Sequence, residues 1–171
     1  GGDGADTIVL AGNYTTLDSI DGGAGTDTVT ITTSGSLTPV FTSVEAVTMT
    51  AAGGGDTLVL TSSTSVNDVT VADGADVATT ISSLGGGTVT NQDTSNTLTV
   101  DTTAAATLIV EAEAANTNAL TITDASTVTL AGTAANGAFG SVTLDAVDTT
   151  SLTVSSAAAT LDINTGVVSG S

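Results

Sequence analysis

Two short stretches of the chain place oxygen ligands at a regular spacing. The sequence GGDGADTIV occupies residues 1–9 and GGAGTDTVT occupies residues 22–30, so the second copy follows the first by 21 residues. Three glycines within the first residues of each stretch allow a sharp turn in which backbone carbonyl groups point to one side. The aspartate that ends each turn, Asp6 or Asp27, adds a carboxylate beside those carbonyls. Several hard oxygen ligands, most of them from the backbone, are the chemistry of a calcium site.

The charge of the chain points to the same chemistry. The 171 residues include 18 Asp and Glu but no Lys, Arg or His, which gives a formal net charge of −18. Carboxylates held close together need a counter-charge, and no side chain of this sequence supplies one, so we expect bound metal cations to do so. Solubility through acidic residues is the alternative explanation of this composition. A surface of this charge repels phosphate groups, so nucleic acids and anionic lipids are not expected partners.

Short strands must position the glycine-rich turns. Runs of four or five residues with alternating apolar and polar character recur along the whole chain, and Gly, Asp, Asn or Ser separate them. The centres of these runs repeat at a period of about ten residues. In DTVTIT the alternation turns Val29 and Ile31 inward and the threonines outward, and in NTLTV it turns Leu98 and Val100 inward.

This pattern predicts an all-β fold, a parallel β-solenoid with about ten residues per half-coil, in which each coil buries its inward face against the next. The offset of 21 residues between the two turns corresponds to one coil, so the turns would face each other across an ion. Tandem antiparallel β-sandwiches are the alternative, since short strands at this spacing suit them too. We expect a calcium-binding part, residues 1–60, and a continuing β-helix with degenerate repeats, residues 61–171. Because the sequence begins within a motif, we expect it to be a piece of a longer chain.

Both glycine-rich stretches fit the nonapeptide pattern G-G-x-G-x-D-x-U-x, with Ile8 and Val29 at the apolar position U. The chain therefore resembles the RTX (repeats-in-toxin) proteins, in which turns of a parallel β-roll bind calcium. The resemblance implies carboxylate ligands from the two aspartates and carbonyl ligands from the turns. The implied ligands are Asp6 and Asp27 for the carboxylates and Gly1, Gly2, Asp3, Gly4, Gly22, Gly23, Ala24 and Gly25 for the carbonyls. Tight turns without an ion are the alternative for this pair.

Later copies of the motif lose some of its residues. The stretch AAGGGDTLVL keeps Gly54 and Asp56 but has alanines where the leading glycines belong. The stretch VADGADVA keeps one glycine and the acids Asp73 and Asp76. We expect these residues to be weaker candidates for calcium ligands, together with Asp21, which flanks the second turn.

The chain differs from long RTX arrays because its nonapeptides stand singly. The nonapeptides are followed by half-coils such as residues 36–51, SLTPVFTSVEAVTMTA. This segment is rich in threonine and has VEAV at its centre. This mixture resembles the RTX-type surface-layer (S-layer) proteins of bacteria and related secreted adhesins. The resemblance implies an extracellular, cell-surface protein, exported by a one-step, type I-like route, that assembles with copies of itself in a calcium-dependent way into a layer, sheath or fibre. It also implies contact with cell-surface polysaccharide through regions outside this sequence.

Other functions fit the sequence less well. A calcium-rigidified stalk of a secreted RTX adhesin is the main alternative. An ice-binding face is weaker, since outward Thr-x-Thr pairs such as Thr97/Thr99 are absent from TIVL and TLVL. We expect no enzyme, because no Lys or Arg base and few aromatic residues accompany the acids Glu111 and Glu113. There is no apolar run of about 18 residues, so we expect no membrane-spanning segment.

Overall fold

The computed structural model describes most of the chain, and most of what it describes is β-strand. It covers residues 1–10, 12, 14–15, 18–74, 78–113, 119–132, 140–144, 150–156 and 164–165. These residues form no helix, and thus no helix of the length and apolar character needed to cross a membrane. The strands are β1 (Thr7–Leu10), β2 (Ser19–Asp21), β3 (Thr28–Thr33), β4 (Ser36–Leu37), β5 (Val40–Thr42), β6 (Ala46–Ala51), β7 (Asp56–Val59), β8 (Asp68–Ala72), β9 (Thr79–Leu84), β10 (Gly87–Asn91), β11 (Leu98–Ala112), β12 (Leu120–Gly132), β13 (Ser141–Leu144), β14 (Ser151–Ser156) and β15 (Asn164–Thr165).

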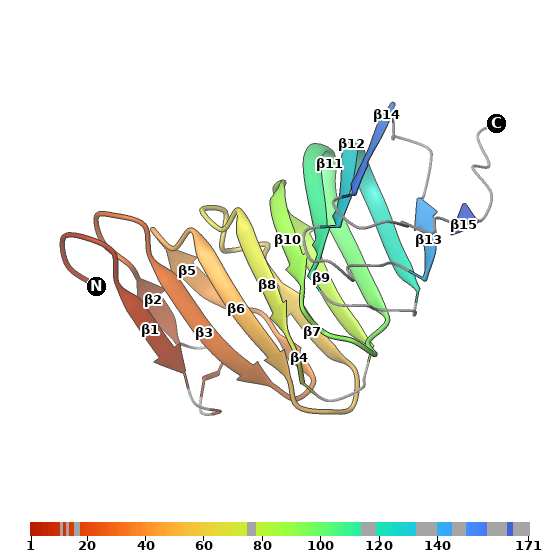
Figure 1. Ribbon diagram of the computed structural model, residues 1–171. Helices are drawn as coiled ribbons and strands as arrows, with labels where there is room; N and C mark the ends of the chain where they lie inside the picture. The colour runs from red at the N-terminus through yellow and green to blue at the C-terminus, as the bar shows by residue number, and fades with distance from the viewer. Residues whose placement is uncertain are drawn as a thin grey trace.

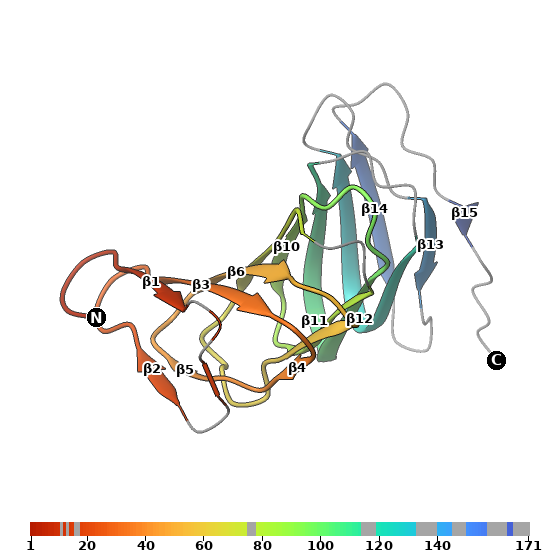
Figure 2. The same cartoon turned by 90° about the horizontal axis from the view of Figure 1, so that it is seen from below.

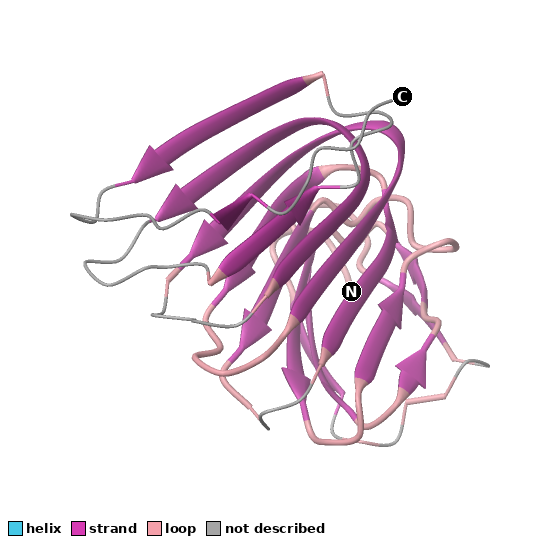
Figure 3. Cartoon of the chain, turned by 90° about the vertical axis from the view of Figure 1, so that its right-hand side faces the viewer, coloured by secondary structure: helices cyan, strands magenta, loops and turns pink. Residues whose placement is uncertain are grey.

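The strand pairings of the described residues are parallel, as a solenoid requires. Each strand pairs with a strand one coil later, and the register offset ranges from 18 residues, between Val29 and Val47, to 24 residues, between Val128 and Leu152. The predicted parallel β-solenoid is confirmed, and the antiparallel sandwiches are wrong. The coils follow one another from β1 to β15, which lie at opposite ends (Figure 1), and their strands run alongside one another (Figure 3).

The strands form two long faces and one short face. The first face contains β1, β3, β6, β8 and β10, continues through the C-terminal halves of β11 and β12, and ends with β14. The second face contains β4, β7 and β9, continues through the N-terminal halves of β11 and β12, and ends with β13 and β15. The short face consists of β2 and β5, which lie apart from β1 and β3 (Figure 2). The predicted division at residue 60 stays a prediction.

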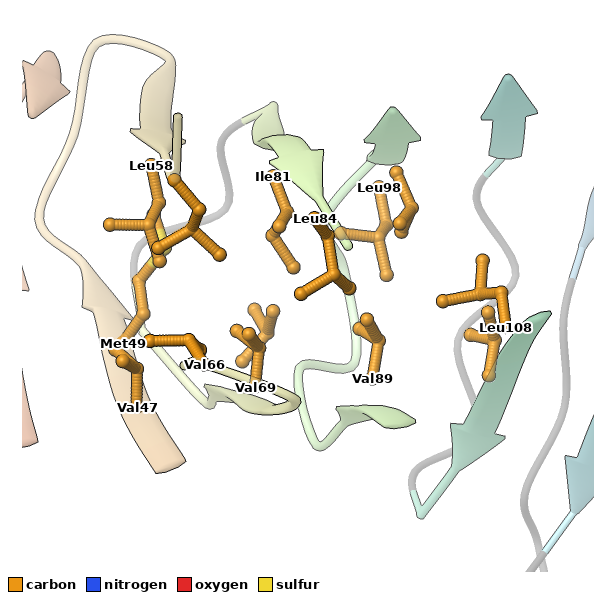
Figure 4. Packing of buried hydrophobic residues seen from close by; sticks show 14 of the residues in the cluster. Val47, Met49, Leu58, Val66, Val69, Ile81, Leu84, Val89, Leu98 and Leu108 are labelled. Atoms are coloured by element: carbon orange, nitrogen blue, oxygen red, sulfur yellow. The ribbon is translucent and has the colours of Figure 1, made fainter. Parts of the chain in front are cut away.

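The hydrophobic core lies between the two long faces. The predicted inward residues Val29, Ile31, Leu98 and Val100 are all buried, so the alternation read from the sequence is confirmed. Side chains from the two faces meet in the interior, as Figure 4 shows. One inward column of the first face stacks in register through six coils with no member more than 1% exposed: Val29, Val47, Val69, Val89, Val110 and Leu130. This continuous column fixes the register of these six coils, because a shift by one residue would expose it.

Two strands are longer than the sequence pattern indicates. The ten-residue spacing predicts separate short strands, whereas β11 and β12 each run through both long faces. The segment DTTAA between Val100 and Ala106 contains no Gly, Pro or Asn that would end a strand. A register shift between Asp101 and Ala106 bends β11 from one face to the other. Earlier coils end their strands at this corner because Gly35, or the three glycines 53–55, adopt positive φ.

Candidate metal site

The two glycine-rich turns lie directly on one another. The turn of residues 1–6 precedes β1 and the turn of residues 22–27 precedes β3, and these strands are parallel neighbours. The Gly4 N–H donates to the Ala24 carbonyl at 2.6 Å, and the Ala24 N–H donates to the Gly2 carbonyl at 2.9 Å. The structure therefore brings the predicted ligands of both turns together at one corner of the solenoid.

Two glycines of the second turn leave no room for a side chain. A Cβ on Gly22 would lie 1.9 Å from the Ser43 carbonyl oxygen and 2.5 Å from Oδ2 of Asp27. Gly25 has a φ of 140°, and a Cβ there would lie 2.3 Å from the Gly4 carbonyl oxygen. Glycine is required at these positions because backbone from the neighbouring coil approaches so closely.

The carboxylates of Asp6 and Asp56 close their own turns. Oδ2 of Asp6 accepts a hydrogen bond from the Gly2 N–H at 2.7 Å, four residues back. Oδ2 of Asp56 accepts one from the Ala52 N–H at 2.9 Å, also four residues back, and its Oδ1 accepts one from the N–H of Gly35 in the preceding coil. Asp56 is buried with a donor on each oxygen, so backbone groups alone satisfy its carboxylate.

Asp27 is buried in the same way but keeps one oxygen without a donor. Its side chain is 0% exposed, and Oδ1 accepts a hydrogen bond from the Asp6 N–H at 2.8 Å. The N–H four residues back, that of Gly23, donates instead to Oδ1 of Asp21 at 3.1 Å. Oδ2 of Asp27 therefore has no hydrogen-bond partner. A buried carboxylate oxygen without a donor is costly, and a bound cation is one way to satisfy it.

Glu45 extends this row of carboxylates into the third coil. Its Oε2 accepts a hydrogen bond from the Asp27 N–H at 2.8 Å, the contact that Asp27 itself makes one coil earlier. The backbone follows the same stacking, since the Gly22 N–H donates to the Thr42 carbonyl at 2.9 Å. Glu45 is not among the ligands that the sequence predicts. The available signal was its position 18 residues after Asp27, which is one coil.

Residues 1–6, 21–27 and 42–45 thus stack into one acidic corner, which contains Asp and Glu side chains from three coils and, like the rest of the chain, no basic residue. Among the described residues no three His, Cys, Asp or Glu side chains gather in a way that could hold a metal ion. A cation here must therefore take most of its ligands from backbone carbonyls. The carbonyls of Gly2 and Ala24 already accept one hydrogen bond each, although a carbonyl has two lone pairs. An all-oxygen donor set suits calcium or magnesium rather than zinc or copper.

Most of the weaker candidates lie away from the acidic corner. The turn with Gly54 and Asp56 follows β6, so it lies at the opposite end of the first-face strands. Asp73 is exposed beyond β8, at the same far end. Asp76 lies outside the described residues. Of the members of this group that the structure describes, only Asp21 belongs to the acidic corner.

A cavity of about 340 Å³ also lies at the far end, between the first coils. Its lining is uncharged and includes Tyr14, Thr33 and Leu37, so it offers no carboxylate to a cation. The Tyr14 hydroxyl donates to the Asp18 carbonyl at 2.7 Å and accepts from the Val40 N–H at 3.1 Å. Burial raises the pKa of Tyr14, with a smaller rise from the Asp18 charge and an opposing effect of the Val40 hydrogen bond.

Comparisons of the chain with protein-family models, with curated proteins and with solved structures found no match. The RTX resemblance therefore depends on the two nonapeptide stretches. The function must be argued from the acidic corner and the coils that form it.

Proposed function

We propose that the chain is a calcium-stabilised β-solenoid of an extracellular structural protein, which assembles with copies of itself at the cell surface. The observation that carries the calcium part is Oδ2 of Asp27, which is buried without a hydrogen-bond donor among stacked backbone carbonyls. The sequence contains no Lys, Arg or His to neutralise this carboxylate. A bound cation supplies the missing positive charge, and oxygen donors from backbone and carboxylates favour calcium.

The ion would bind between the turns of the first two coils, with Asp6 and Asp27 as carboxylate ligands and turn carbonyls as the others. Calcium takes about six to eight oxygen ligands at about 2.3–2.6 Å. Oδ2 of Asp6 and the Gly22 carbonyl oxygen both lie within 2.2 Å of the position that a Cβ would take on Gly1. These two oxygens are therefore close enough to share one ion.

Calcium would also decide where the protein folds. Without a cation the carboxylates of the acidic corner repel one another, since no basic side chain lies among them. Binding to the folded state alone couples the free energy of binding to the free energy of folding. Because calcium is scarce in the cytosol and abundant outside the cell, the solenoid would reach full stability only after export.

The acidic composition of the chain supports the assembly part of the proposal. Its 18 Asp and Glu side chains have no Lys, Arg or His among them, so copies of the solenoid repel one another without a cation. Calcium would reduce the repulsion between acidic flanks that otherwise keeps copies apart.

Light scattering of the purified chain in calcium, in magnesium and in chelator tests the proposal. We expect large particles only in calcium, and none for Asp27→Asn at the same calcium concentration. Glu111→Gln removes one negative charge outside the acidic corner and should assemble as the wild type does. Assembly in chelator would contradict the calcium dependence. A chain that gains stability in calcium but stays monomeric would favour the stalk of a secreted adhesin instead.

A further inference from the structure

The arrangement of oxygens around Gly1 is repeated one coil later around Gly22. A Cβ added to Gly1 would lie 2.2 Å from Oδ2 of Asp6 and 2.0 Å from the Gly22 carbonyl oxygen, so these two oxygens lie close together. A Cβ added to Gly22 would lie 2.5 Å from Oδ2 of Asp27 and 1.9 Å from the Ser43 carbonyl oxygen. The same pair of donors, one carboxylate and one carbonyl of the next coil, therefore occurs twice along the acidic corner.

Only in the second pair does the carboxylate oxygen lack a protein donor. Oδ2 of Asp6 accepts the Gly2 N–H, whereas Oδ2 of Asp27 has no donor in a side chain that is 0% exposed. Buried polar atoms in folded proteins nearly always have a partner, so an exception indicates a missing ligand. This oxygen lies beside Gly22 and the Ser43 carbonyl, on the side of the third coil.

Ser43 adopts a conformation that non-glycine residues rarely take. Its φ is 50°, in the left-handed region, and its carbonyl approaches Gly22. The residues beside it are held in place, because the Val44 N–H donates to Oγ of Ser65 at 3.2 Å and the Glu45 N–H donates to the Asp27 carbonyl at 3.1 Å. The corner thus fixes the Ser43 carbonyl next to the unpartnered oxygen.

Glu45 brings a second carboxylate to the same place. Its Oε2 is hydrogen-bonded to the Asp27 N–H at 2.8 Å, which holds the side chain against the turn. This hydrogen bond engages Oε2 and leaves Oε1 as the second oxygen of the carboxylate. Residues 42–45 contain no glycine, so the nonapeptide pattern does not predict a site here.

We infer that the acidic corner binds a second calcium ion, between the turn of residues 22–27 and residues 42–45, through Oδ2 of Asp27, the Ser43 carbonyl and the Glu45 carboxylate. The inference rests on the proposed calcium-dependent function and extends its ligand set into the third coil. Asp27 then contributes Oδ2 to the second ion and Oδ1, which also accepts the Asp6 N–H, to the first.

Counting the calcium ions per chain by isothermal titration calorimetry and native mass spectrometry tests this inference. We expect two ions on the wild type, and one each on Asp6→Asn and on Glu45→Gln, which remove a carboxylate from the first and the second site respectively. Glu45→Gln keeps an oxygen that can accept the Asp27 N–H, so its circular dichroism spectrum should match the wild type. The matched control Glu111→Gln, outside the acidic corner, should bind two ions.

The outcomes separate this inference from the function on which it rests. One ion on the wild type, unchanged by Glu45→Gln, would overturn the second site and leave the calcium-stabilised solenoid intact. No ion on the wild type would overturn both. If Glu45→Gln does not fold, the wild-type count decides, since two ions support the second site and one ion excludes it.

Discussion

Replacing Asp27 by asparagine should change the stability of the solenoid in opposite directions without and with calcium. Asparagine keeps an oxygen that accepts the Asp6 N–H and places an NH₂ group where Oδ2 now has no donor. The new amide can donate to the nearby Ser43 carbonyl. A buried polar atom without a partner costs about 1–3 kcal/mol, so we expect Asp27→Asn to be more stable than the wild type by about 1–2 kcal/mol in chelator.

Calcium should reverse this order. An ion present at about 100 times its Kd stabilises the folded state by about 2.7 kcal/mol per site. Asp27→Asn lacks the carboxylate that serves the ion, so only the wild type gains this stabilisation in full. We therefore expect the wild type to become more stable than the variant by about 1–4 kcal/mol, the range covering one or two sites.

Urea denaturation followed by circular dichroism, in chelator and in calcium, measures both differences. Asp56→Asn is the matched control, because backbone N–H groups of Ala52 and Gly35 already satisfy that buried carboxylate. It should lower the free energy of unfolding by about 2–4 kcal/mol in both solutions, since an amide NH₂ would face a donor. A change of the same sign in both solutions for Asp27→Asn would refute the reasoning.

Three further predictions test the turns, the core and the one tyrosine. Gly25→Ala should abolish calcium binding in calorimetry, because the φ of Gly25 is 140° and a Cβ there would lie 2.3 Å from the Gly4 carbonyl oxygen of the stacked turn. Gly2→Ala is the control, since a Cβ on Gly2 would meet no atom within 4 Å, and it should bind calcium as the wild type does. Leu98→Ala should lower the free energy of unfolding in urea by about 2–5 kcal/mol and Thr99→Ala by less than about 1 kcal/mol, and equal losses would contradict the inward and outward assignment. Burial raises the pKa of Tyr14 above its usual 10.0, so the unfolded chain loses this proton first and stability should fall as the pH rises from there through the folded pKa. Phenolate absorbance should show a later titration in the folded chain than in urea, and coincident curves would exclude the shift.

The core of the solenoid follows from local sequence, whereas its shorter strands do not. Alternating β-branched residues predict which side chains turn inward, because a strand has a period of two wherever it pairs. The strands β2, β4 and β5 contain only two or three residues, and the alternation did not identify them. They exist because a neighbouring coil offers backbone partners, which no local pattern records.

The sequence predicts some features of the candidate site and not others. Asp6 and Asp27 occupy the same position of the motif and lie 21 residues apart, which is one coil, so the sequence predicts that they meet. The hydrogen bonds of each carboxylate cannot be read from the motif, because Asp56 and Asp27 end similar glycine-rich turns and only Asp27 lacks a donor. Glu45 follows Asp27 by 18 residues, three fewer than separate Asp6 and Asp27, so a search at a fixed repeat length passes over it.

We propose that calcium completes this fold at the acidic corner. Circular dichroism of the chelated chain during a calcium titration, with magnesium as the control, measures whether it does. We expect β-structure and melting temperature to rise to a plateau with calcium and to change little with magnesium. A β-spectrum and a melting temperature that are the same in chelator and in calcium would contradict the claim, because backbone hydrogen bonds alone would then hold the glycine-rich turns.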